Sequence, residues 1–141
     1  MTPARPWLFV EQDELLAMHA HAVARYGGEP SPPKAGCLER SIGAAITAAL
    51  YSSDSQDPDL VVAVSYLLVY LAKNHCFVDG NKRVAWMALL RALDLNGLAV
   101  EADEIDAAVL VNDVATGAVD AIGVARWLTE PGRLIAAPFP N

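Results

Sequence analysis

Six stretches of helical length with apolar residues on one face follow one another along the chain. In Glu11 to Tyr26, apolar side chains recur every three to four residues, and Gly27-Gly28 ends the stretch. The other five are Cys37 to Tyr51, a segment capped by Asp59 that runs to about Asn74, Gly80 to Leu95, Ala102 to Thr116, and Val119 to Leu128. This pattern predicts an all-α protein, a bundle of about six helices.

Two short apolar stretches, Leu8 to Val10 and Leu98 to Val100, could each be extended and pair with one another. The 141 residues contain no internal repeat and no low-complexity segment, so we expect one compact domain spanning residues 1–141. Its core is expected at about residues 8–130. The proline-containing tail, 131–141, is expected to be loosely held.

Composition limits the classes of partner. The net charge is −7 and the sequence pI is near 4.7, which argues against nucleic acid because phosphate-backbone binding needs a basic face. Hydrophobic residues make up 54% of the chain and charged residues 19%, so an apolar surface for a protein partner is expected.

The two cysteines predict no disulfide framework. Cys37 and Cys76 are too few and too far apart in sequence for a disulfide scaffold, and no zinc-binding spacing is present. Cys76 follows His75, which suggests a thiol nucleophile, but no third group that would orient the pair is evident. No signal peptide precedes Trp7, and Leu60 to Leu71 is too short to span a bilayer. We therefore expect a protein of the reducing cytoplasm that makes no membrane contact.

The most chemically informative stretch joins the third and fourth predicted helices. It reads His75-Cys76-Phe77-Val78-Asp79-Gly80-Asn81-Lys82-Arg83. Because the fourth helix begins here, its first turn presents unpaired N–H groups and the positive end of the helix dipole, which bind anions. Lys82 and Arg83 add two cations, which favours a polyphosphate. Asp79 can hold a divalent metal, and His75 can accept a proton from a hydroxyl.

The nonapeptide resembles the signature loop of the Fic/Doc superfamily, H-x-F-x-[D/E]-[G/A]-N-x-R, at every fixed position. Three further stretches, Arg25 to Pro30, Gly36 to Glu39 and Leu95 to Gly97, resemble its death-on-curing (Doc) branch. The resemblance covers roughly residues 8–130 and implies a compact bundle of about six helices, which agrees with the helical pattern.

By this resemblance, His75 is the catalytic base and Asp79 holds Mg²⁺. The phosphates of ATP are bound at Gly80, Asn81, Lys82 and Arg83. Phe77 is expected to point away from His75 and to anchor the loop.

The resemblance also bears on which group of ATP is transferred. In the Fic branch, which transfers AMP, a glycine follows the asparagine of the motif and a second arginine comes later. Lys82 and Trp86 occupy those positions here. The Doc branch has the lysine, and by resemblance it binds ATP in the reversed sense and transfers the γ-phosphoryl group. A protein serine/threonine kinase is therefore predicted. The alternatives are a Fic-type adenylyltransferase and a non-catalytic protein-binding module.

The resemblance further implies a bacterial toxin that phosphorylates a threonine of elongation factor EF-Tu and so arrests translation. Its antitoxin is expected to be of the Phd type, bound through a C-terminal helix in a groove of the toxin. A flap that aligns the protein substrate is expected from Gly36 to Pro58. Neither the antitoxin, the modified residue nor the oligomeric state can be identified from the sequence.

Other residues carry a structural interpretation. His19 and His21 lie two residues apart on one helix, so they face different sides and cannot form a metal pair; His19 is expected to be a hydrogen-bonded core residue. Trp86 and Trp127 are expected in the core or at an interface. The aspartates Asp54, Asp57 and Asp59 lack the glycine and glutamate of a calcium loop and predict a solvated loop.

Overall fold

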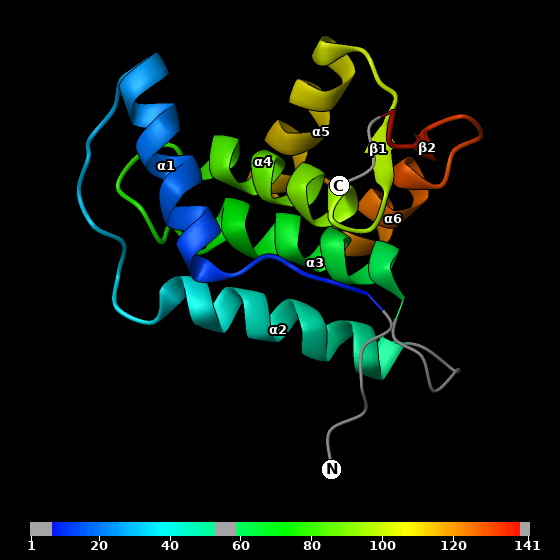
Figure 1. Cartoon of the computed structure of the whole chain (residues 1–141), viewed down its shortest axis with the longest axis horizontal. Coiled ribbons are helices and arrows are strands. Elements are labelled where there is room, and N and C mark those ends of the chain that lie inside the picture. The colour runs from blue at the N-terminus through cyan, green and yellow to red at the C-terminus, as the bar shows by residue number, and fades with distance from the viewer. Residues whose placement is uncertain (1–6, 53–58, 139–141) are drawn as a thin grey trace.

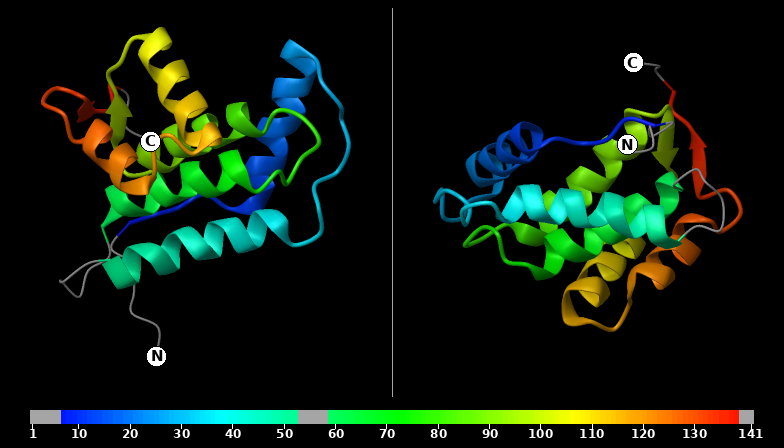
Figure 2. Two further views of the ribbon diagram at one scale, coloured as in Figure 1. Left: turned by 180° about the vertical axis from the view of Figure 1, so that it is seen from behind. Right: turned by 90° about the horizontal axis from the view of Figure 1, so that it is seen from below.

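Helix α3 (Leu60–Lys73) lies at the centre of the structure, a computed structural model that describes residues 7–52 and 59–138. Helices α2 (Cys37–Ser52), α4 (Asn81–Asp94), α5 (Glu104–Thr116) and α6 (Ala121–Leu128) all contact it, and α1 (Gln12–Tyr26) packs across α4 and α2 (Figures 1 and 2). The prediction of an all-α bundle of about six helices is confirmed.

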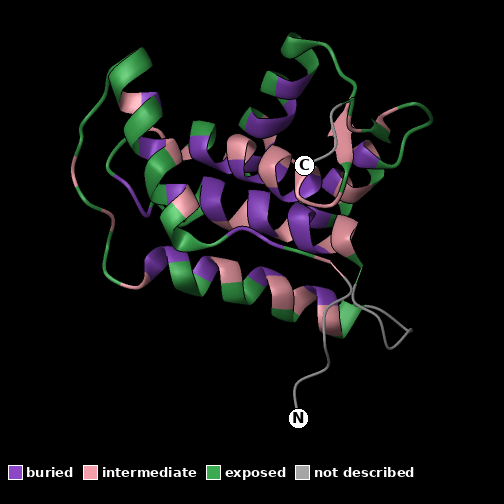
Figure 3. Ribbon diagram, in the orientation of Figure 1, coloured by how far each residue is buried: buried purple, intermediate pink, exposed green. Residues whose placement is uncertain are grey.

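The central position of α3 follows from its sequence, which is apolar on nearly every side. Seven of its residues are buried, including Leu67 and Leu68, which have no exposed surface (Figure 3). Burying a leucine side chain contributes roughly 1.5–3 kcal/mol. The one buried hydroxyl of α3, on Ser65, donates to the Val61 carbonyl at 2.7 Å.

Aspartate side chains define where three helices begin. Asp59 accepts a hydrogen bond from the Val61 N–H at 2.7 Å, as the sequence predicted. Asp103 and Asp120 cap α5 and α6 in the same way. Each carboxylate satisfies an N–H group that the helix leaves unpaired and complements the helix dipole.

The short sheet differs from the prediction. Leu98 to Val100 does form a strand, β1 (Leu98–Val100), but the pairing with Leu8 to Val10 that the sequence allowed does not occur. Strand β1 pairs antiparallel with β2 (Leu134–Ala136), with Ala99 opposite Ile135. The tail, expected to be loosely held, therefore contributes a strand over 134–136.

The N-terminal segment takes no part in the sheet and is held instead by the side chain of Asn96. This side chain accepts from the Leu8 N–H and donates to the Leu8 carbonyl, both at 2.8 Å. The segment thus satisfies its backbone through a side chain.

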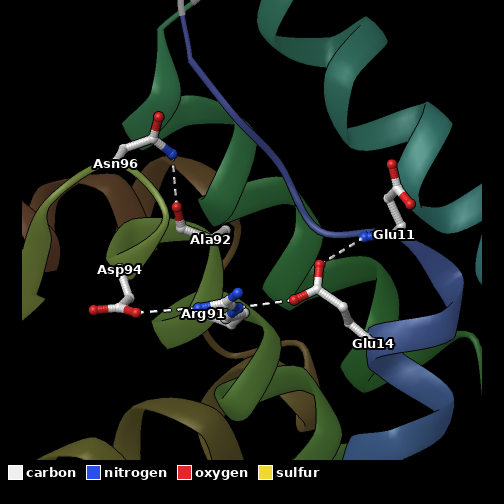
Figure 4. A network of polar contacts seen from close by, with 6 residues as sticks. All are labelled: Glu11, Glu14, Arg91, Ala92, Asp94 and Asn96. Carbon is white, nitrogen blue, oxygen red and sulfur yellow. Dashed lines mark hydrogen bonds and ion pairs between the residues drawn. The ribbon is translucent and has the colours of Figure 1, made fainter. Parts of the chain in front are cut away.

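An ion pair fixes α1 against α4. Arg91 donates to Glu14 at 2.8 Å and to Asp94 at 3.2 Å (Figure 4). The hydrogen bond to Glu14 is the main cause of a raised pKa of Arg91. Since the carboxylate of Glu14 also accepts from the Glu11 N–H, the same network closes the first turn of α1.

The prediction for the cysteines is wrong, because Cys37 and Cys76 form a disulfide with their Cα atoms 5.5 Å apart. They are 39 residues apart in sequence, but packing α2 against α3 brings the first residue of α2 beside the loop that follows α3. Both cysteines are buried, so Cys76 is not available as a nucleophile.

In the described part of the chain, no helix is long and apolar enough to cross a membrane.

Breaking this disulfide should lower stability. Reduction, or Cys37→Ser, should decrease the free energy of unfolding by about 2–4 kcal/mol, because the bond closes a long loop in the unfolded chain. Thermal unfolding with and without a phosphine reductant measures the effect. Cys37→Ser is the control, since its melting temperature should not respond to reductant. Equal melting temperatures of the wild type in both conditions would contradict the prediction.

Candidate active site

The loop between α3 and α4 carries the predicted site residues at one end of the bundle. Beside it runs the connection from α1 to α2, residues 27–36, on the outer side in both Figures 1 and 2. His75 is exposed and has a φ of +49°, a left-handed conformation in the described residues that is otherwise found only at glycines. Such a conformation costs of order 1 kcal/mol and is common at functional positions. Its imidazole has no hydrogen-bond partner among the described residues, so it is open to a bound substrate.

Phe77 and Asn81 close the loop from within. The side-chain amide of Asn81 accepts from the Phe77 N–H at 3.0 Å and donates to the Phe77 carbonyl at 2.8 Å. The Phe77 ring is buried and lies parallel to the ring of His19, with 3.8 Å between centroids. Phe77, the predicted loop anchor, thus has a specific partner on α1. The side chain of Asn81, a residue predicted to bind phosphate, holds the backbone of the loop.

Asp79 is held by the neighbouring connection. One carboxylate oxygen, Oδ2, accepts from the Glu29 N–H at 3.0 Å. Residue 28 of this connection is glycine with a φ of +124°, a backbone conformation that other residues rarely adopt; a Cβ there would only touch the Cβ of Asp79, at 3.4 Å. The second oxygen, Oδ1, has no hydrogen bond to the rest of the described chain. It is therefore available to a metal ion, which suits an oxygen-binding cation such as Mg²⁺.

The N-terminus of α4 is open to an anion. The first backbone hydrogen bond of this helix runs from Val84 to Gly80, so the N–H groups of Gly80, Asn81, Lys82 and Arg83 precede it. Gly80 occupies the N-cap with a φ of +82° and has no side chain to satisfy them. The four residues predicted to bind phosphate are those four.

The two cations leave this helix turn in different directions. Arg83 lies over the ring of Tyr26, 4.2 Å from its centroid, beside the loop. Lys82 instead donates to Asn112 Oδ1 on α5 at 3.3 Å. Both Lys82 and Asn112 are exposed, so this contact holds the ammonium group only weakly.

Lys82 and Arg83 also line a groove of about 1010 Å³ between α4 and α5. Its apolar lining includes Trp86 on α4 and Ile105 and Val109 on α5, and the latter two are 72% and 53% exposed. Trp86 also packs edge-to-face on Trp127, so the prediction of a core or interface position is confirmed for both.

Some contacts of the site were not assigned from the sequence. Tyr26 contacts Arg83, and Gly28 lies beside Asp79, in each case more than 50 positions away in sequence. The only hint of either contact was that Tyr26 and Gly28 belong to a stretch that carries the family resemblance. His19 is buried and hydrogen-bonded, as predicted. The sequence did not identify its partner, which is the carbonyl of Asp79 in the site loop.

Two further predictions concern segments near the site. The region Gly36 to Pro58, expected to provide a flap, is mostly helix α2, and residues 53–58 lie outside the described part. Asp54 and Asp57 lie there too. Within the described residues, no group of three or more His, Cys, Asp or Glu side chains is arranged to hold a metal.

Known proteins resemble this chain over most of its length. The Fic/DOC family model matches residues 9–93. The chain is 36% identical to "Toxin Doc" of Mycolicibacterium smegmatis over 122 residues, 85% of this chain and 90% of that protein. It is 34% identical to "Protein kinase doc" of Escherichia phage P1 over 119 residues, 84% and 91% of the two chains. This chain belongs to the Fic/DOC family. Both relatives place it in the Doc branch.

The role of Asn81 in shaping the Fic/DOC loop can be tested with Asn81→Ala. The substitution leaves two backbone groups of Phe77 without partners and should lower stability by roughly 1–3 kcal/mol. Faster hydrogen exchange of the Phe77 amide should accompany the loss. Asn112→Ala, which removes an exposed contact, is the control and should change neither quantity. Unaltered exchange of the Phe77 amide in Asn81→Ala would refute this role.

Proposed function

We propose that this chain is a toxin of the Doc type, a protein kinase that transfers the γ-phosphoryl group of ATP to a serine or threonine hydroxyl. Lys82 carries this proposal. It stands at the second residue of α4, at an uncapped helix N-terminus, where adenylylating members of the superfamily have glycine. With ATP bound, the ammonium group of Lys82 would leave its weak contact with Asn112 and turn to the terminal phosphate, and the side chain would take up the space that the adenylylating pose needs. The relative from phage P1, named as a protein kinase, supports the same choice.

Each residue of the loop then has a role in phosphoryl transfer. His75 accepts the proton as the substrate oxygen bonds to the γ-phosphorus and the bond to the leaving ADP oxygen breaks. The N–H groups of residues 80–83 and the cation of Arg83 stabilise the negative charge of the phosphates. Mg²⁺ held by Asp79 Oδ1 would neutralise part of the same charge. Such catalysis relies on positioning, which a small domain can supply.

The family resemblance suggests the target, a threonine of EF-Tu, with arrest of translation as the consequence. EF-Tu is a cytoplasmic protein, so this target requires the enzyme to act in the bacterial cytoplasm. A disulfide is uncommon there. We therefore expect Cys37 and Cys76 to be reduced in part of the population while the noncovalent contacts of the loop remain.

The groove between α4 and α5 is proposed to bind the antitoxin, a protein of the Phd type, through its C-terminal helix. Ile105 and Val109 are one turn apart on α5 and face the groove with Trp86, so they suit the apolar stripe of an amphipathic helix. Lys82 and Arg83 offer two cations to an acidic residue of that helix. Since both cations belong to the phosphate site, a bound helix would inhibit the enzyme directly.

Parallel labelling tests the proposed reaction. Purified protein, Mg²⁺ and ATP labelled at either the α- or the γ-phosphate are added to a bacterial translation extract. A protein of the size of EF-Tu should acquire the γ-label and no α-label, and translation should fall in parallel.

Two controls and two alternative outcomes make that experiment decisive. His75→Ala should remain folded and transfer at most a small fraction of the label, because the base is lost. Chelation by EDTA should stop transfer by the wild type. Transfer of the α-label would instead establish an adenylyltransferase, and transfer of neither label by folded protein would establish a binding module.

Lys82→Gly tests the residue that carries the proposal. Loss of a charge-assisted hydrogen bond to the transferred phosphate should lower turnover by about one to two decades, roughly 1.5–3 kcal/mol. Lys82→Met is the matched variant: it keeps the stem but not the charge, so it should lose kinase activity without opening space for the adenylylating pose. Unchanged turnover of folded Lys82→Gly would remove the main support for phosphorylation.

A further inference from the structure

His19 is a buried polar residue whose ring stacks on the active-site loop and whose Nε2 atom hydrogen-bonds to it. It stands on the face of α1 that also buries Leu15 and Ala22, and only 5% of its surface is exposed. Its ring lies parallel to Phe77, with an angle of 6° between the planes and 3.8 Å between the centroids. Its Nε2 atom lies 3.0 Å from the carbonyl oxygen of Asp79.

The chemistry of this contact determines the proton position on His19. A carbonyl oxygen only accepts hydrogen bonds, so Nε2 must carry the proton and donate it. The Asp79 carbonyl belongs to an irregular backbone segment, where neither helix nor sheet can satisfy it. An apolar side chain of similar size would fill the volume but leave the carbonyl without this donor.

The same contact bears on the start of α4. The peptide bond that His19 holds joins Asp79 to Gly80, and Gly80 is the left-handed N-cap of the helix. The Gly80 Cα faces the His19 ring, since a Cβ there would lie 3.5 Å from Cδ2. Asp79 is therefore fixed from two sides: its carbonyl by α1, and its carboxylate by the Glu29 N–H.

We propose that His19 is a positioning residue for phosphoryl transfer. Its ring determines how deeply Phe77 is buried in the core, and its Nε2–H determines the orientation of the Asp79–Gly80 peptide. Together these contacts point the free oxygen of Asp79 and the N–H groups of residues 80–83 toward one phosphate. His19 itself does not touch the substrate. The inference rests on the kinase function proposed above and adds a residue of α1, far from the nonapeptide in sequence, to its machinery.

Two substitutions separate the ring from the hydrogen bond. His19→Phe keeps a ring that can stack on Phe77 but removes the donor. His19→Gln removes the ring but places an amide nitrogen near the position of Nε2. The exposed His21, on another side of α1, provides the control His21→Phe.

The readouts are the Mg²⁺ concentration for half-maximal γ-phosphoryl transfer, Mn²⁺ binding with a non-hydrolysable ATP analogue, and hydrogen exchange of the amides of residues 79–84. His19→Phe should need at least roughly tenfold more Mg²⁺ and bind Mn²⁺ correspondingly less tightly, the loss that follows removal of a group that orients a metal ligand, here through its backbone. It should also exchange these amides faster. The KM for the protein substrate should stay within about twofold, since His19 does not contact that substrate. His19→Gln should restore most of the Mg²⁺ response, and His21→Phe should match the wild type.

Equal loss of stability in His19→Phe and His19→Gln, with the metal response and amide exchange unchanged in both, would overturn the proposal and leave His19 a packing residue. If the wild type transfers no γ-label, the kinase proposal fails on its own. Amide exchange of residues 79–84 in the two variants still decides whether His19 holds the loop in its conformation.

Discussion

The burial of α3 is the constraint on which the rest of the structure depends. Because nearly every side of this helix is apolar, four other helices must pack around it. Its last residue, Lys73, then leaves the core at one fixed end of the bundle, and the site loop begins directly afterwards. The position of the loop is thus a consequence of how the core is filled.

The conformation of the loop depends on local contacts and on contacts from distant parts of the chain. Asn81 and Gly80 act locally, by closing the turn and by allowing a left-handed N-cap. His19 and Glu29 come from α1 and from the connection that follows it, and both hold Asp79.

The disulfide adds a covalent tie between the loop and α2. Beside it, the Cys76 carbonyl accepts from the Lys34 N–H at 2.8 Å. The buried Ser41 hydroxyl accepts from the Asn74 side chain at 2.9 Å. The residues on either side of His75 are therefore fixed while its own side chain stays exposed, as a residue that must meet a substrate hydroxyl requires.

The site places local positive charge on an acidic protein. Uncapped N–H groups at the start of α4 and the side chains of Lys82 and Arg83 are concentrated within one helical turn, while the whole chain carries a net charge of −7. The groove between α4 and α5 begins at the same two cations. One short stretch of α4 therefore borders both the proposed phosphate site and the proposed antitoxin groove, which would let occupation of one affect the other.

The sequence by itself determined the helices, because their apolar periodicity, aspartate caps and glycine ends are local properties. It also determined the nonapeptide, whose residue types and spacing within one loop carry the family resemblance. Only the tertiary structure decided which distant groups meet: β1 with β2 in place of Leu8 to Val10, Cys37 with Cys76, His19 with the Asp79 carbonyl, and Tyr26 with Arg83. These contacts join residues 34 to 60 positions apart, and no local pattern records them, because they depend on the angles at which the helices pack around α3.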